Sequence, residues 1–331
     1  MPEPVLRQDP QSDEPNVTGL PILVLVGPTA SGKSSLAVQV ARRLAGAGRP
    51  AEIVNADSML VYRGMDIGTA KPTPDERGGV PHHLIDIADV TETASVADFQ
   101  QLAREVIAGC RKRGVLPIVV GGSSLYVRAI VDRFDFPGTD PVVRARWEDE
   151  LDRVGPEELH RLLAEREPEA AAEILPGNGR RIVRALEVIE LTGSFTAHLP
   201  TWEYALDPVV QVGLDLPRDV LDARIAERVD QMWRDGFVDE VRRLLEVGLR
   251  DGLTASRALG YRQVIALLDG ELDEAAAREQ TITGTRRFSR KQLGWYRRDD
   301  RISWLSAGAD DLADRVIALL DDRGQRAQWT P

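Results

Sequence analysis

The chain is poor in cysteine and has no long hydrophobic run. A single cysteine, Cys110, among 331 residues rules out an intramolecular disulfide and any cysteine-rich zinc site. No apolar stretch reaches the roughly 18 residues that cross a bilayer, and the N-terminus lacks the apolar segment of a secretory signal. These absences predict a cytoplasmic protein that does not interact with a membrane.

Lysine is also scarce, and acidic residues outnumber basic ones by 53 to 42. The net charge is −11, and only four of the 42 basic residues are lysine. A protein that binds nucleic acid through its overall charge would be basic, so local patches must hold any anionic partner. Two arginine groups, within residues 180–184 and 286–301, are candidates, although solvated helix faces would give the same pattern. The four histidines lack the spacing of a metal cluster.

Hydrophobic runs typical of buried strands alternate with amphipathic helical segments. The predicted strands are 22–26, 51–56, 83–87, 117–120, 209–216 and 302–305. Helices are expected after the segment 27–34, up to residue 44, and at 95–113, 218–247, 255–268 and 273–298. This alternation predicts an α/β fold with a doubly wound parallel sheet.

The alternation stops near residue 136, where a charged, helical segment without a strand candidate begins. This break predicts a small all-helical insertion domain within the α/β core. The predicted parts are a disordered tail at 1–19, a first core part at 20–136, the insertion at 137–208, a second, mostly helical core part at 209–323 and a tail at 324–331.

The strongest chemical signal is the segment GPTASGKS at 27–34, which matches the pattern of a phosphate-binding P-loop. It follows a predicted buried strand and opens a helix, as this loop requires. Backbone N–H groups would bind phosphate oxygens, Lys33 would add a positive charge, and the Ser34 hydroxyl would hold Mg²⁺. The predicted phosphate site comprises Gly27, Pro28, Thr29, Ala30, Ser31, Gly32, Lys33 and Ser34.

Asp57 follows the second predicted strand, at the edge where ligands of open α/β sheets bind. A carboxylate there would accept a proton from an attacking nucleophile, although a surface or helix-capping aspartate would look the same. The strand at 117–120 runs into Gly121 and Gly122 rather than into the aspartate of ATP-hydrolysing motors. These residues alone favour a small transferase, either a kinase or an enzyme that acts on a diphosphate.

Six segments carry a family resemblance: GPTASGKS (27–34), NADSMLVYRGMDIGTAKP (55–72), PHHLIDI (81–87), PIVVGGSSLY (117–126), RRIVRALEVIELTG (180–193) and GYRQ (260–263). In this order they resemble the tRNA dimethylallyltransferase family, and P-loop kinases do not share the second segment. The resemblance implies transfer of a dimethylallyl group from dimethylallyl diphosphate to N6 of the adenosine 3′-adjacent to the tRNA anticodon, with release of diphosphate.

The resemblance also implies roles for individual residues. The P-loop would hold the diphosphate leaving group with Mg²⁺ on Ser34. Lys33 and Arg228, with Arg224 one helical turn earlier, would stabilise the charge that grows on the diphosphate. Asp57 would take the proton from N6 as the amine attacks.

Contacts to the tRNA anticodon stem-loop are implied in the same way. The target adenosine must leave its stacked loop to reach a buried site. The residues implied to contact this adenosine and its neighbours are Asp57, Ser58, Met59, Leu60 and Ser123. The residues of the insertion that are implied to bind the anticodon stem-loop are Arg144, Arg180, Arg181, Ile182, Val183 and Arg184. Leu60 stands where many family members have glutamine. No self-pairing segment is evident, so we expect a monomer.

Two alternatives stay open on the sequence. One is a P-loop kinase for a small molecule with Asp57 as its base, and the other is a P-loop module that holds RNA without chemistry. The segment 57–72 and the insertion argue against the kinase. The combination of Lys33, Ser34 and Asp57 argues against an inert module.

Overall fold

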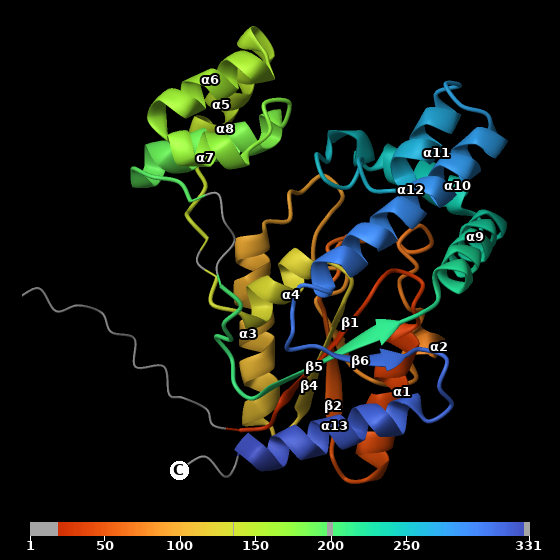
Figure 1. Ribbon diagram of the computed structural model, residues 1–331. Helices are drawn as coiled ribbons and strands as arrows, with labels where there is room; N and C mark the ends of the chain where they lie inside the picture. Colours follow the sequence, from red (N-terminus) through yellow and green to blue (C-terminus); the bar gives the residue numbers. More distant parts are fainter. Residues whose placement is uncertain (1–18, 135, 197–200, 328–331) are drawn as a thin grey trace, which may run out of the picture. The chain divides into compact units, whose positions relative to one another are not determined.

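The computed structural model describes residues 19–134, 136–196 and 201–327, which form two compact units (Figure 1). One unit contains the described residues up to Val131 and from Leu206 onward, and the other lies within Asp132–Ala205. The second unit is thus displaced by a few residues from the predicted insertion at 137–208. Apart from Gly19, the predicted N-terminal tail lies outside the described residues. Helix α13 (Leu312–Ala327) runs past the predicted core boundary at 323.

A six-stranded, all-parallel sheet forms the centre of the first unit and confirms the predicted α/β class. All five residues of β1 are buried, as expected for a strand covered on both faces. Because β1 lies between β4 and β5, the loop after it opens at the middle of the carboxyl edge. The strands are β1 (Ile22–Val26), β2 (Ala51–Asn55), β3 (His82–His83), β4 (Leu116–Gly121), β5 (Val209–Asp215) and β6 (Ser303–Ser306), in the order β3-β2-β4-β1-β5-β6.

Helices cover both faces of this sheet (Figure 1). On one face, α1 (Lys33–Gly46) and α13 pack against each other and share an apolar core with β1, β2, β4 and β5. On the other face, α3 (Val96–Lys112) and α4 (Ser124–Val131) contact β4. The hydroxyl of Ser95 accepts the N–H of Asp98 at 3.2 Å, which forms the helix start predicted for α3.

The prediction of one long helix at 218–247 was wrong. The segment forms α9 (Arg218–Arg234) and α10 (Phe237–Glu246), which are separated at Gly236. Gly236 has φ of 93°, a left-handed conformation that ends the helical path and that glycine adopts without a steric penalty. Gly260, with φ of 90°, similarly delays the start of α11 (Tyr261–Leu268). The next helix, α12 (Glu274–Tyr296), follows the prediction closely, and the short pieces are α2 (Pro74–Arg77) and η1 (Leu249–Asp251).

The second unit has an apolar core of its own, built from helices. Trp147, Leu163 and Leu186 are among its buried side chains. The first three helices each have proline in the first turn, where the missing N–H removes no helical hydrogen bond. The helices are α5 (Pro141–Val154), α6 (Pro156–Arg166), α7 (Pro168–Glu173) and α8 (Gly179–Thr192).

Candidate active site

The loop between β1 and α1 has the backbone of a phosphate cradle. Gly27 and Gly32 have φ of 147° and 90°, and Ala30 has φ of 62°. A left-handed alanine is strained, and such strain is typical of ligand-binding loops. A side chain at Gly27 would place its Cβ 3.1 Å from the carbonyl oxygen of Leu214 on β5, so the loop lies tightly against the sheet. Gly32 then starts α1, whose N-terminus favours an anion.

Two side chains of the loop are prepared to donate to an anion. The Ser31 hydroxyl is buried and makes no hydrogen bond within the described part of the chain, so its donor is left for a ligand. The Lys33 ammonium group donates to the carbonyl oxygen of Pro28 at 2.7 Å. Burial lowers the pKa of Lys33 to about 8, against the opposing effect of Asp57 and with a smaller contribution from Arg228. An incoming phosphate would therefore meet a half-buried cation.

Asp57 is held in a turn directly after β2. Its N–H donates to the side-chain oxygen of Asn55 at 2.8 Å, and the Asn55 amide donates in return to the Asp57 carbonyl oxygen at 3.0 Å. Its carboxylate oxygen Oδ1 accepts the N–H of Met59 at 2.9 Å. The other oxygen, Oδ2, accepts no hydrogen bond among the described residues and remains available for a proton.

Arg228 of α9 completes the ring of charges around the loop. Its guanidinium lies 3.5 Å from the hydroxyl of Thr29 in the cradle. Burial lowers the pKa of Arg228, whereas Asp57 and Glu76 act to raise it. The structure therefore brings Lys33, Arg228 and Asp57 close together, whereas Arg224 is exposed, and the roles expected of these residues stay predictions.

The ends of β2 and β4 approach each other beside this group. A side chain at Gly121 would place its Cβ 2.3 Å from the carbonyl oxygen of Ala56, so only glycine fits there. The hydroxyls of Ser58 and Ser123 consequently lie 3.4 Å apart. Met59 and Leu60 follow in the same half-exposed loop. The predicted adenosine contacts are therefore neighbours of the cradle and not scattered residues.

The segment after Leu60 is fixed by residues that sequence reasoning missed. The buried carboxylate of Glu240 on α10 accepts the N–H groups of Asp66, Ile67 and Gly68. It also accepts the hydroxyl of Tyr261 at 2.6 Å. No sequence motif marks Glu240, because its role depends on the tertiary contact between α10 and the segment that begins at Asp66, which lies 174 residues earlier in the chain.

The predicted tRNA-gripping arginines of the second unit divide into two kinds. Arg144 and Arg184 both donate to the buried carboxylate of Glu187, at 2.6 and 2.8 Å. Burial alone would raise the pKa of Glu187, but hydrogen bonds from Thr139, Arg184 and Arg144 lower it. Both arginines therefore stabilise the fold of this unit, and only their partly exposed edges face solvent.

The remaining members of this set lie on α8. Arg180 and Arg181 are exposed at its first turn. Ile182 and Val183 are 0% and 1% exposed and belong to the apolar core of the unit. Their side chains pack inward, because helical periodicity turns them away from the face of Arg180, so the contact of this pair with tRNA stays a prediction that their side chains do not support.

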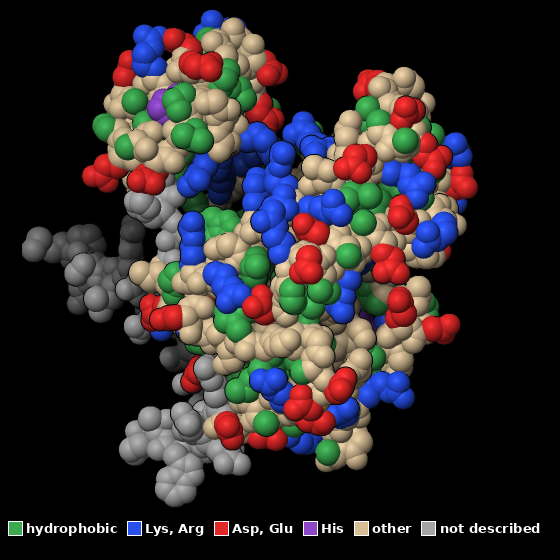
Figure 2. Space-filling model, turned by 45° about the vertical axis from the view of Figure 1, so that its right-hand side comes forward, with side chains coloured by type: hydrophobic (Ala, Val, Ile, Leu, Met, Phe, Trp, Pro, Cys, Tyr) green, Lys and Arg blue, Asp and Glu red, His purple; other side chains and the backbone are tan. Residues whose placement is uncertain are grey.

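Several arginines of the second group, at 286–301, also have partners within the protein. Arg286 donates to the carbonyl oxygen of Asp222, Arg297 pairs with Asp215 at 2.7 Å, and Arg301 pairs with buried Asp299. Lys and Arg side chains gather in places on a surface that also carries many acidic groups (Figure 2). The prediction that local arginine patches hold an anionic partner therefore suits the exposed arginines of 286–301 better than it suits this group as a whole.

A separate cluster lies at the amino end of β2. One oxygen of Glu52 is 2.8 Å from His83 Nε2, 3.3 Å from Cys110 Sγ and 2.5 Å from a guanidinium nitrogen of Arg113. Burial and then the hydrogen bond to Glu52 raise the pKa of the Cys110 thiol to about 11. Because Arg113 already neutralises the carboxylate and the thiol stays protonated, we interpret the cluster as a hydrogen-bonded network and not as a metal centre.

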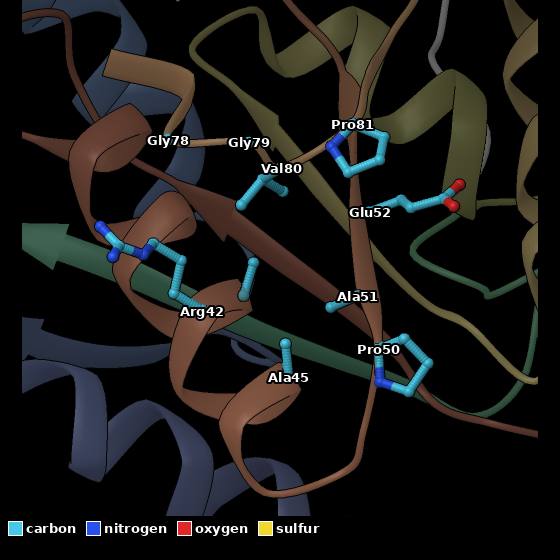
Figure 3. A pocket seen from close by; sticks show the side chains of 10 residues that line it. Arg42, Ala45, Pro50, Ala51, Glu52, Gly78, Gly79, Val80 and Pro81 are labelled. Carbon is cyan, nitrogen blue, oxygen red and sulfur yellow. The ribbon is translucent and has the colours of Figure 1, made fainter. Parts of the chain in front are cut away.

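Glu52 also lines a surface pocket of about 300 Å³ between α1 and the start of β2 (Figure 3). Arg42 and Ala45 of α1 face Pro50 and Ala51, with Gly78–Pro81 above them. The pocket lies at the opposite end of β2 from Asp57, so it does not belong to the phosphate site.

The sheet order, the cradle and the adjacent carboxylate define a P-loop α/β protein built to act on a phosphate-bearing substrate. The sequence model of the IPP transferase family matches residues 60–299, and the chain belongs to this family. The family resemblance predicted from the six segments is thereby confirmed. No helix in the described ranges is long and apolar enough to span a membrane.

Individual relatives extend the match to most of the chain. A tRNA dimethylallyltransferase of Cutibacterium acnes is 62% identical over 299 residues, which cover 90% of this chain and 94% of the relative. One from Thermobifida fusca is 60% identical over 300 residues, with the same two coverages.

Solved structures agree with the sequence comparisons. The tRNA isopentenylpyrophosphate transferase of Bacillus halodurans has a TM-score of 0.68 and 38% identity, over 93% of this chain and 99% of its own. A eukaryotic dimethylallyltransferase acting on tRNA has a TM-score of 0.74 but 24% identity, over 93% of this chain and 80% of its own, and it supports the fold alone.

Proposed function

We propose that this protein is a magnesium-dependent tRNA dimethylallyltransferase that works as a monomer in the cytoplasm. Its substrates are dimethylallyl diphosphate and the adenosine 3′-adjacent to the anticodon. The nitrogen N6 forms a bond to the allylic carbon C1, the C1–O bond breaks, and its electron pair leaves with the diphosphate. The observation that carries this proposal is that the phosphate cradle with Lys33 and the carboxylate of Asp57, whose Oδ1 alone accepts a hydrogen bond among the described residues, lie at the same edge of the sheet.

The cradle supports the leaving group. Negative charge grows on the diphosphate as C1 becomes cationic, and Lys33 and Arg228 lie where they stabilise that charge. The hydroxyl of Ser31, which has no hydrogen-bond partner in the described ranges, adds a neutral donor. These groups are fixed before the substrate arrives, so little reorganisation accompanies the reaction.

The donor set at the start of α1 also fits a hard divalent cation. The hydroxyl of Ser34 is exposed in the first turn, and an oxygen ligand of this type suits Mg²⁺, which completes its shell with water and phosphate oxygens. When bound, the ion would neutralise part of the diphosphate charge.

Asp57 supports the nucleophile. The exocyclic amine is weakly basic and must lose a proton during or after its attack, so a nearby carboxylate is needed. Asn55 holds the backbone of Asp57, and the N–H of Met59 holds its carboxylate by Oδ1, which leaves Oδ2 to receive that proton. Ser58 and Ser123 then offer hydroxyls to the base beside it.

The tRNA is bound by local groups and not by overall charge. The net charge of −11 gives no long-range attraction for RNA, so the exposed Arg180 and Arg181 must supply phosphate contacts. The adenosine is extruded from its loop to reach Asp57, as enzymes that modify bases require.

The test is a label-transfer assay. Protein, Mg²⁺ and unmodified tRNA are mixed with dimethylallyl diphosphate labelled in its carbon chain or with γ-labelled ATP. We expect the carbon label to enter tRNA, Lys33→Ala to abolish its entry, and the exposed Lys112→Ala to leave it unchanged. Transfer from ATP to any acceptor would favour a kinase, and tRNA binding without transfer of either label would favour a binding module; both outcomes refute the proposal.

A further inference from the structure

One buried side chain connects the two halves of the site. Gln292 of α12 is 5% exposed. Its oxygen Oε1 accepts the N–H of Thr29 at 2.9 Å, and its nitrogen Nε2 donates to the carbonyl oxygen of Gly122 at 2.9 Å. Thr29 belongs to the phosphate cradle, and Gly122 directly precedes Ser123.

The surrounding structure is shaped for this amide. A side chain at Gly122 would place its Cβ 2.5 Å from Nε2 of Gln292, so glycine is needed to admit it. One helical turn further along, the hydroxyl of Tyr296 lies 3.4 Å from the carbonyl oxygen of Gly121. One face of α12 is therefore docked on the end of β4 and on the cradle together.

We propose that Gln292 is a positioning residue that sets the distance between the diphosphate and the attacking adenosine. This inference rests on the proposed function, since Thr29 lies on the leaving-group side and Ser123 on the nucleophile side. Displacement at C1 requires the reacting atoms to approach within about 3–3.5 Å, and a misplacement of about 1 Å lowers the rate by roughly 100-fold. Gln292 touches neither reacting atom and acts through the two loops that it joins.

The chemistry of the link is specific. The side chain must accept a hydrogen bond at one end and donate one at the other, over the length of glutamine. Methionine fills a similar volume with neither bond. A glutamate carboxylate keeps only the acceptor, whereas protonated glutamic acid restores the donor.

The experiment measures single-turnover transfer with both substrates saturating. For Gln292→Met we expect a rate about 10–100-fold below wild type, while the separate dissociation constants for dimethylallyl diphosphate and tRNA change less than about 3-fold. The matched control is Gln101→Met, at an exposed glutamine of α3 whose side chain donates to Glu105 of the same helix, and it should behave as wild type.

A second variant keeps the test decisive if Gln292→Met does not fold. The rate of Gln292→Glu, divided by the wild-type rate at each pH, should rise as the pH falls from about 8 to about 6, because protonation restores the donor to Gly122. A flat ratio would overturn the inference, as would a Gln292→Met rate within about 3-fold of wild type or losses of affinity that match the loss of rate. A wild-type protein that transfers no dimethylallyl group would refute the proposed function instead.

Discussion

The affinity for dimethylallyl diphosphate should fall as the pH rises above 8, because Lys33 binds it only when protonated. Burial lowers the pKa of Lys33 from 10.5 to about 8 in the free protein, and a bound diphosphate must raise it again. Binding therefore takes up a proton at high pH. With a pKa of about 8, the ammonium form of Lys33 in the free protein makes up about 75% of the population at pH 7.5 and about 3% at pH 9.5, so the dissociation constant should rise about 25-fold over this range.

The measurement is calorimetric titration with an analogue in which sulfur replaces the bridging oxygen, so that no transfer occurs. Working from about pH 7.5 to 9.5 keeps the phosphate groups fully ionised, which leaves Lys33 as the titrating group of interest. Lys33→Arg is the informative variant, because a guanidinium stays protonated throughout the range and its affinity should be nearly independent of pH. Lys112→Ala serves as the control, because Lys112 is an exposed lysine of α3.

Two results would refute this reasoning. A wild-type affinity that does not change across the range would mean that Lys33 is not the partner of the diphosphate. An equal pH dependence in Lys33→Arg would assign the proton to another group in the site.

Three further predictions concern the base, the RNA contacts and the second unit. Asp57→Asn should lower kcat by about 10²–10⁴-fold and change substrate dissociation constants only a few-fold; equal losses of affinity in binding titrations would make Asp57 a ligand-holding residue instead. Combining Arg180→Glu with Arg181→Glu should weaken tRNA binding. It should also reduce the slope of log affinity against log salt concentration by about 0.7–0.9 per lost contact, whereas Arg161→Glu on α6 should change neither. An unchanged slope would assign Arg180 and Arg181 to a solvated helix face. Glu187→Gln should destabilise the second unit by about 1–3 kcal/mol in chemical denaturation, and an unchanged midpoint would contradict its central role.

The parts of this site that are local in sequence were predictable, and the parts that depend on packing were not. GPTASGKS specifies its own loop, and Asp57 needs only the rule that ligands gather at the carboxyl edge of a parallel sheet. Gln292 lies 263 residues from Thr29, in a stretch of helix that the sequence marks only by its arginines, so only the tertiary fold brings the two together. Nothing about its local sequence distinguishes it from a surface glutamine.

Other features of the structure had sequence signals that went unused. Ile182 and Val183 were predicted to contact RNA because they lie inside a recognised segment, but their spacing to Leu186 already indicates that their side chains lie on the inner face of α8. Arg184 and Glu187 are three residues apart on one helix, the spacing of an ion pair. Gly236, within a long helical pattern, similarly indicates that a helix ends there, although the helical periodicity continues on both sides of it.

The turn at Asp57 determines what an amide substitution would put in the site. The N–H of Met59 donates to Oδ1, so an asparagine at this position must turn its own carbonyl oxygen toward Met59 to keep that bond. Its NH₂ group would then occupy the place of Oδ2. The variant would thus place an amide nitrogen, which cannot accept a proton, at the point where N6 must release one. The backbone N–H of Met59, which takes no part in the chemistry, therefore determines whether the oxygen or the nitrogen of the asparagine amide faces the substrate.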